Sequence, residues 1–124
     1  MFFKFSLVAL LTTSAFSFNF YVSQELKGLK LKEKAFKNLF LGKTKYIAGI
    51  KYPIRIAIDS RVYQDERFST YFSTSPKTFK STWRRKLFSG GAIPPRTFRS
   101  LKELKDFLKK HKYSVVLTDK HLRE

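Results

Sequence analysis

The chain has 124 residues, a net charge of +17 at pH 7 and no cysteine. That length allows one small domain, and the missing thiols exclude disulfides, cysteine catalysis and thiolate metal sites within it. Its 14 phenylalanines, 6 tyrosines and single tryptophan are the main candidates for a core that packing alone must hold together.

The first seventeen residues have the pattern of a secretory signal peptide. Lys4 gives a positive start, residues 5–15 are mostly apolar, and Ala15-Phe16-Ser17 has small residues at the two positions that a signal peptidase recognises. We therefore expect a signal peptide that is cleaved near Ser17-Phe18, and a single periplasmic or secreted domain over residues 18–124. Retention of the segment as an anchor is the alternative, although the apolar run is short for a membrane span.

Two short segments predict the first strand and the first helix of this domain. Residues 19–23 are mostly apolar and predict a strand. Leu31, Ala35 and Leu39 recur every four residues, which is the spacing of an amphipathic helix. Gly42 follows and predicts the end of that helix, because glycine readily takes the left-handed conformation that often terminates one.

The middle of the chain predicts a strand, a turn and a helix. Isoleucine at every second position of residues 53–58 is typical of a strand. Asp59 and Ser60 favour a turn, and residues 64–72 have helical apolar spacing. In open α/β sheets ligands bind beyond the carboxyl ends of strands, so Asp59, Ser60 and Arg61 are the first candidates for a site. The alternative is that Asp59 and Ser60 only cap the next helix.

The next helix has clear signals at both ends. Ser75 is a suitable N-cap, and Pro76 suits the first helical position. Apolar side chains then recur at every fourth residue, a stripe more typical of a core than of a ligand platform: Phe79, Trp83 and Leu87. Ser89-Gly90-Gly91 predicts the end of the helix, and two prolines require an extended chain over residues 92–96.

The last two predicted elements are a helix and a strand. Ser100 and Glu103 form a capping box that opens the helix, and residues 113–118 are rich in the residue types of a strand. The resulting order is strand, helix, strand, three helices and strand. Strands separated by helices predict an α/β fold, here a small, mainly parallel, three-stranded sheet flanked by helices on both faces.

Several short motifs of the chain occur together in one known family. They are Phe40-Leu41-Gly42-Lys43, Gly49, the strand at 53–58, Arg67-Phe68, Trp83, Phe88-Ser89-Gly90, Pro95, and a helix at 100–108 that leads to a strand. From Phe18 to about Thr118 the chain resembles the small exported substrate-binding proteins of phosphate ABC transporters, which look like reduced periplasmic phosphate receptors. The resemblance implies one lobe of a type II periplasmic-binding-protein fold and a non-catalytic, solute-binding role in transport.

The resemblance also implies a ligand, namely phosphate or a related oxyanion. We expect its site to comprise Asp59, Ser60 and Arg61, with Arg67 and the Gly90-Gly91 loop nearby, since an arginine fork can bond two oxygens at once. Arg67 is equally compatible with an ordinary surface arginine. The turn lacks the glycine that lets backbone N–H groups surround an anion in the full-length receptors.

The positive charge leaves other functions open. It should attract polyanions, anionic lipid head groups or small oxyanions. The alternative is that the lysines are ordinary solvated surface residues of a lysine-rich protein. The alternative to solute binding is a structural or adaptor protein that keeps the fold without a ligand and contacts an acidic partner or a membrane surface. A nucleic-acid partner is disfavoured, because no such motif accompanies the charge and the predicted signal peptide directs export.

Catalysis and cofactors are not expected. His111 and His121 are the only histidines, and neither has carboxylates at metal-ligand spacing. No serine stands in a nucleophile elbow or beside a candidate base. We therefore expect neither an enzyme nor a metal or other cofactor.

Overall fold

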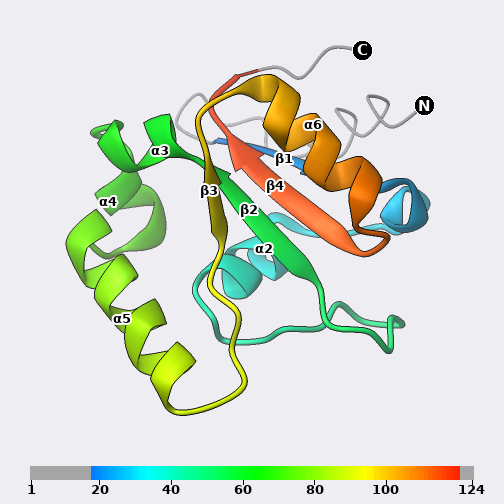
Figure 1. Ribbon diagram of the computed structural model, residues 1–124, viewed down its shortest axis with the longest axis horizontal. Helices are drawn as coiled ribbons and strands as arrows, with labels where there is room; N and C mark the ends of the chain where they lie inside the picture. The colour runs from blue at the N-terminus through cyan, green and yellow to red at the C-terminus, as the bar shows by residue number, and fades with distance from the viewer. Residues whose placement is uncertain (1–17, 121–124) are drawn as a thin grey trace.

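The computed structural model describes residues 18–120, so the predicted signal peptide lies outside the described residues. The strands are β1 (Asn19–Val22), β2 (Arg55–Asp59), β3 (Arg96–Phe98) and β4 (Ser114–Thr118). The helices are the 3-10 turn η2 (Gln24–Leu26), α2 (Glu33–Phe40), α3 (Ser60–Gln64), α4 (Phe68–Phe72), α5 (Pro76–Phe88) and α6 (Leu101–Lys110). The strands form one mixed sheet in the order β1-β4-β2-β3, with helices on both of its faces (Figure 1).

Two parallel strands form the centre of the sheet. β2 runs parallel to β4, with Arg55 opposite Ser114, and parallel to β3 on its other side, with Ala57 opposite Arg96. Every residue of β4 and the last four of β2 are buried. Burial on both faces explains why the middle of each strand is a continuous apolar run, IAI in β2 and VVL in β4.

Aromatic side chains join the helices to the sheet. Figure 1 shows α6 in front of the sheet and α2 behind it. The ring of Phe20 in β1 stacks on that of Phe36 in α2, with centroids 4.9 Å apart. Trp83 of α5 donates its indole N–H to the backbone carbonyl of Phe40 at 2.9 Å, which ties α5 to the end of α2. Phe79 and Trp83 of the predicted α5 stripe are buried in the core, whereas Leu87, its third residue, is 49% exposed near the end of the helix.

The predicted α/β class is confirmed, but the sheet differs from the three-stranded, mainly parallel one that we expected. It has four strands, because Arg96–Phe98 continues the predicted extended segment and pairs with β2. It is mixed, because β1 runs antiparallel to β4. Apolar patterning identifies a strand but carries no information about the direction of its neighbour.

The helix expected over residues 64–72 is two short helices. α3 already begins at Ser60, and α4 begins only at Phe68. Between them Asp65 is extended, and its carboxylate accepts the backbone N–H of Arg67 at 2.8 Å. A side chain that takes a nearby backbone donor in this way competes with helical hydrogen bonds and interrupts the helix.

Ser23 gives the first testable prediction, because its buried hydroxyl fastens the edge strand β1 to β4. The hydroxyl donates to the carbonyl of Lys112 at 2.5 Å and accepts the N–H of Ser114 at 3.1 Å. We expect Ser23→Ala to lower the free energy of unfolding by about 2 kcal/mol, since it removes two hydrogen bonds and leaves the buried N–H of Ser114 without a partner. Urea denaturation measures this.

Ser89→Ala is the matched control, since that hydroxyl is exposed and makes one 3.2 Å bond to a carbonyl. We expect it to change the free energy of unfolding by about 0.5 kcal/mol at most. Equal losses in the two variants would contradict the assigned role of Ser23.

Candidate functional site

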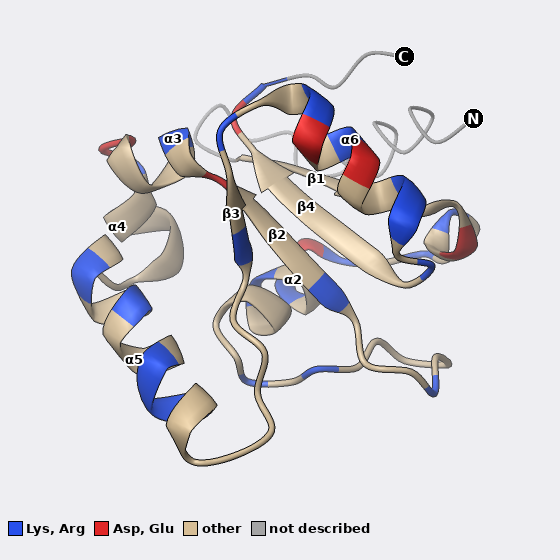
Figure 2. Cartoon of the chain, viewed as in Figure 1, with Lys and Arg blue, Asp and Glu red and all other residues tan. Residues whose placement is uncertain are grey.

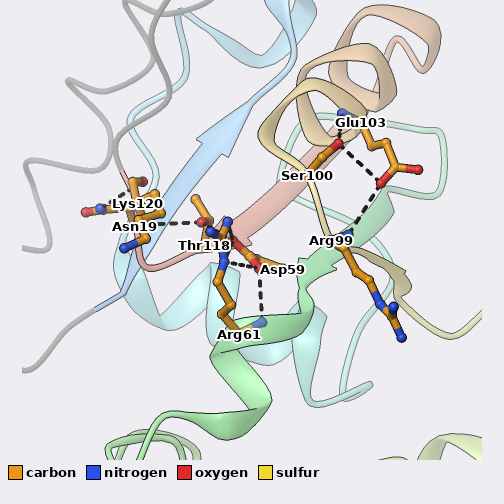
Figure 3. Close-up of polar contacts among 8 residues, drawn as sticks. All are labelled: Asn19, Asp59, Arg61, Arg99, Ser100, Glu103, Thr118 and Lys120. Carbon is orange, nitrogen blue, oxygen red and sulfur yellow. Dashed lines mark hydrogen bonds and ion pairs between the residues drawn. The ribbon is translucent and has the colours of Figure 1, made fainter.

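A fully buried carboxylate stands at the carboxyl end of β2, where the sequence predicts a site. Asp59 caps α3 by accepting the backbone N–H of Arg61 at 3.0 Å. The Arg61 guanidinium donates to both carboxylate oxygens, with Nε 3.0 Å from Oδ1 and Nη2 2.5 Å from Oδ2. The hydroxyl of Thr118, at the end of β4, donates to Oδ2 at 2.8 Å. Asp59 therefore links the ends of β2 and β4 to the start of α3 (Figure 3).

Asp59 and Arg61 already pair with each other at this end of the sheet. Burial by itself would raise the pKa of Asp59, but hydrogen bonds from Arg61 and Thr118 and the positive charge of Arg61 lower it below its ordinary value of 3.8. The hydrogen bond to Asp59 in turn raises the pKa of Arg61. An incoming anion would compete with a carboxylate that already holds the guanidinium.

Arg67 repeats the same arrangement six residues later. Its Nε lies 2.9 Å and its Nη2 2.6 Å from the carboxylate oxygens of Asp65, and its guanidinium carbon lies 5.0 Å from the ring centre of Phe18. The hydrogen bond from Arg67 is the main reason why the pKa of Asp65 is lowered. Ser60 is the half-buried first residue of α3. Both predicted arginines therefore bind carboxylates of their own turns.

The structure places the predicted glycines elsewhere. Gly90 and Gly91 follow α5, with φ of 100° and 106°, and lie at the opposite end of the sheet from Asp59, Ser60 and Arg61, near the start of β2 (Figure 1). The structure thus brings Asp59, Ser60 and Arg61 together, with Arg67 on the neighbouring helix, and separates the glycine loop from them.

The glycine loop lines a pocket of about 410 Å³, which we call the basic pocket. Three connections form it: residues 42–45 after α2, residues 53–56 entering β2, and residues 89–93 after α5. Trp83 and Lys86 of α5 line another side, and Leu39 of α2 completes it. The pocket therefore lies where three segments distant in the sequence converge.

The basic pocket contains four positive charges and no negative one. Lys43, Lys45, Arg55 and Lys86 line it, and no Asp or Glu does. Across residues 18–120, none of these four cations forms an ion pair. Lys43 and Lys45 are exposed, while Arg55 and Lys86 are half-buried. Figure 2 shows the Lys and Arg residues along α5 and at the start of β2. An anion here would meet cations with no competing carboxylate.

Gly42 allows Lys86 to reach the basic pocket. The backbone of Gly42 has φ of 75°, and a Cβ added there would lie 2.8 Å from Cε of Lys86 and 3.3 Å from Cη2 of Trp83. Glycine takes this conformation without strain, and its missing side chain leaves space for Lys86. The aliphatic part of Lys86 consequently lies directly against the turn that carries Lys43.

Sequence reasoning did not identify the lysines of this pocket or Arg55. The one local signal was the Lys43-Thr44-Lys45 stretch directly after a helix-ending glycine. Arg55 is an ordinary alternating residue of a strand, and Lys86 is one of several cations on α5. Their proximity to one another comes from the tertiary fold.

In the part of the chain that the structure describes, no three His, Cys, Asp or Glu side chains gather closely enough to hold a metal ion. No helix among residues 18–120 has the length and apolar character needed to cross a bilayer. No protein-family model, curated protein or solved structure matches the chain.

The depressed pKa of Asp59 predicts how stability depends on pH. We expect Asp59→Asn to be about 2 kcal/mol less stable than the wild type at pH 7, because it loses charge-assisted hydrogen bonds in a buried place. Because the pKa of Asp59 is lower in the folded state, the unfolded chain takes up the proton first as the pH falls. The stabilisation by the ionised Asp59 carboxylate is therefore fully present above pH 3.8 and is lost as the pH falls through the folded-state pKa.

Urea denaturation over a range of pH tests this, and the difference between wild type and Asp59→Asn should shrink at acid pH. Asp106→Asn is the control, since Asp106 is exposed and pairs only with Lys102 on the same helix. A difference for Asp59→Asn that stays constant on acidification contradicts the assigned ionisation.

Proposed function

We propose that the protein is a non-catalytic binding module for phosphate or a related oxyanion, and that the basic pocket holds the anion. The observation that carries this proposal is the set of four unpaired cations around one hollow without a carboxylate. Cations brought together repel one another, and a bound anion removes that repulsion. The pocket is also large enough for an oxyanion with several of its waters.

The lining of the basic pocket suits recognition better than chemistry. Arg55 offers a fork that can bond two oxygens, and the three lysines offer point charges that adapt to a small anion. The consecutive glycines 90 and 91 lack side chains, so an anion can approach the backbone there. The lining includes no carboxylate and no histidine to act as a general base.

The resemblance to phosphate-transporter substrate-binding proteins supports the same class of ligand. On this proposal the helix-flanked sheet corresponds to one lobe of a type II periplasmic binding protein, and the predicted signal peptide directs the domain to the periplasm. The anion would differ from the sequence-based expectation in its position, lying near the start of β2 and not beyond its carboxyl end.

Calorimetric titration of phosphate and of sulfate into the purified protein tests the proposal. We expect heat of binding, and we expect the triple variant Lys43→Gln, Lys45→Gln, Lys86→Gln to weaken affinity by about tenfold or more, since losing about 1.4 kcal/mol of charge-assisted contact has that effect. The matched control replaces lysines 30, 32 and 34, which are exposed and do not line the pocket.

The control loses the same net charge as the pocket variant. It therefore distinguishes binding in the pocket from a general electrostatic attraction of the anion to the protein. We expect it to change affinity by about twofold at most, because distant exposed charges are screened by salt. If Arg67→Gln abolishes phosphate binding while the pocket variant retains it, the anion binds near the end of β2. Absence of binding heat with both anions would reject oxyanion recognition.

A further inference from the structure

The exposed large apolar residues among residues 18–120 lie in sequence next to the segments that line the basic pocket, and Ile93 lines it. Five large hydrophobic residues in this part of the chain are well exposed: Tyr46, Tyr52, Leu87, Phe88 and Ile93. They belong to two segments, 46–52 and 87–93, which directly adjoin the pocket-lining residues 42–45, 53–56 and 89–93. We call these five side chains the apolar rim.

The side chains of the apolar rim are largely exposed in the folded protein. The side chain of Phe88 is 83% exposed, and that of Ile93 is 57% exposed although it lines the pocket. Tyr52 is 59% exposed, with its ring stacked on that of Tyr113 at a centroid distance of 5.1 Å. Isolated exposed hydrophobic residues are ordinary, but their concentration at one end suggests contact with another surface.

Free phosphate does not account for the apolar rim. A small hydrated anion needs the cations of the pocket, and it gains nothing from an exposed phenylalanine or isoleucine beside them. A surface that carries phosphate groups above an apolar layer would engage both features. An anionic phospholipid bilayer has that composition, with charged head groups above the acyl chains.

The positive charges beside the apolar rim favour a lipid surface over a protein partner. Six cations lie in or next to the segments that carry the apolar rim: Lys43, Lys45 and Lys51 on the connection between α2 and β2, and Arg84, Arg85 and Lys86 on α5. Protein interfaces are depleted in lysine, whereas lysines and arginines beside aromatic and aliphatic side chains are typical of segments that rest on anionic bilayers. Each such cation near an anionic membrane strengthens binding to it.

We propose that this end of the molecule docks on anionic phospholipid membranes, with a head-group phosphate in the basic pocket and the apolar rim entering the boundary between head groups and acyl chains. The inference rests on the proposed function, because the bound oxyanion is then part of a lipid. Leu87 and Phe88 lie outside the pocket lining, so insertion and phosphate recognition can be separated by mutation.

Co-sedimentation of the protein with vesicles tests the proposal. One set of vesicles is phosphatidylcholine alone, and the other is an equal mixture of phosphatidylcholine and phosphatidylglycerol. We expect binding to the mixed vesicles to exceed binding to phosphatidylcholine by about tenfold or more, since several cations each contribute to it. The double variant Leu87→Ser, Phe88→Ser should lose about tenfold in binding to the mixed vesicles, because burying one large apolar side chain contributes 1.5 kcal/mol or more.

The variants used for calorimetry distinguish the possible outcomes. Leu87→Ser, Phe88→Ser should bind free phosphate as the wild type does. The triple variant of lysines 43, 45 and 86 should lose both phosphate and vesicle binding, and the control at lysines 30, 32 and 34 should retain both.

Phosphate binding without vesicle binding overturns membrane docking and leaves the proposed function standing. Vesicle binding that depends on the apolar rim, without phosphate binding, rejects recognition of the free anion and retains docking. Vesicle binding that is equal in all variants assigns it to another part of the chain and overturns the proposal.

Discussion

The need to pair a buried carboxylate organises one end of this sheet. An ionised side chain without water must receive hydrogen bonds and an opposite charge, and Asp59 receives them from Arg61 and Thr118. These contacts hold the ends of β2 and β4 and the start of α3 in one arrangement. They also occupy the guanidinium of Arg61, whereas the buried Oδ1 of Asp119, directly after β4, has no hydrogen-bond partner among the described residues.

The cations at the two ends of β2 differ in whether a carboxylate pairs with them. At the carboxyl end, Arg61 and Arg67 each bind an aspartate two residues earlier in the chain. At the amino end, Lys43, Lys45 and Arg55 converge without a counter-ion among the described residues. Among the described residues, the arginines at one end of β2 are thus paired with carboxylates, while the cations at the other end are not.

The sequence predicted those features that depend on neighbouring residues. Ser75 and Ser100 cap their helices as expected, each through a hydroxyl that accepts the N–H three residues on, and alternating isoleucines located β2. The pairing of β3, the direction of β1 and the basic pocket depend on segments far apart in the chain, which no local pattern encodes. The break at Asp65 was local, but its carboxylate suits a helix start and a helix interruption equally well.

The edge strand has a consequence for how the chain folds. β1 pairs with the last strand of the sheet, and Ser23 bonds Ser114 across a separation of 91 residues. Contacts this distant in sequence demand extensive loop closure and slow the folding reaction. The sheet cannot be completed until β4 has been synthesised, because β4 lies between β1 and β2.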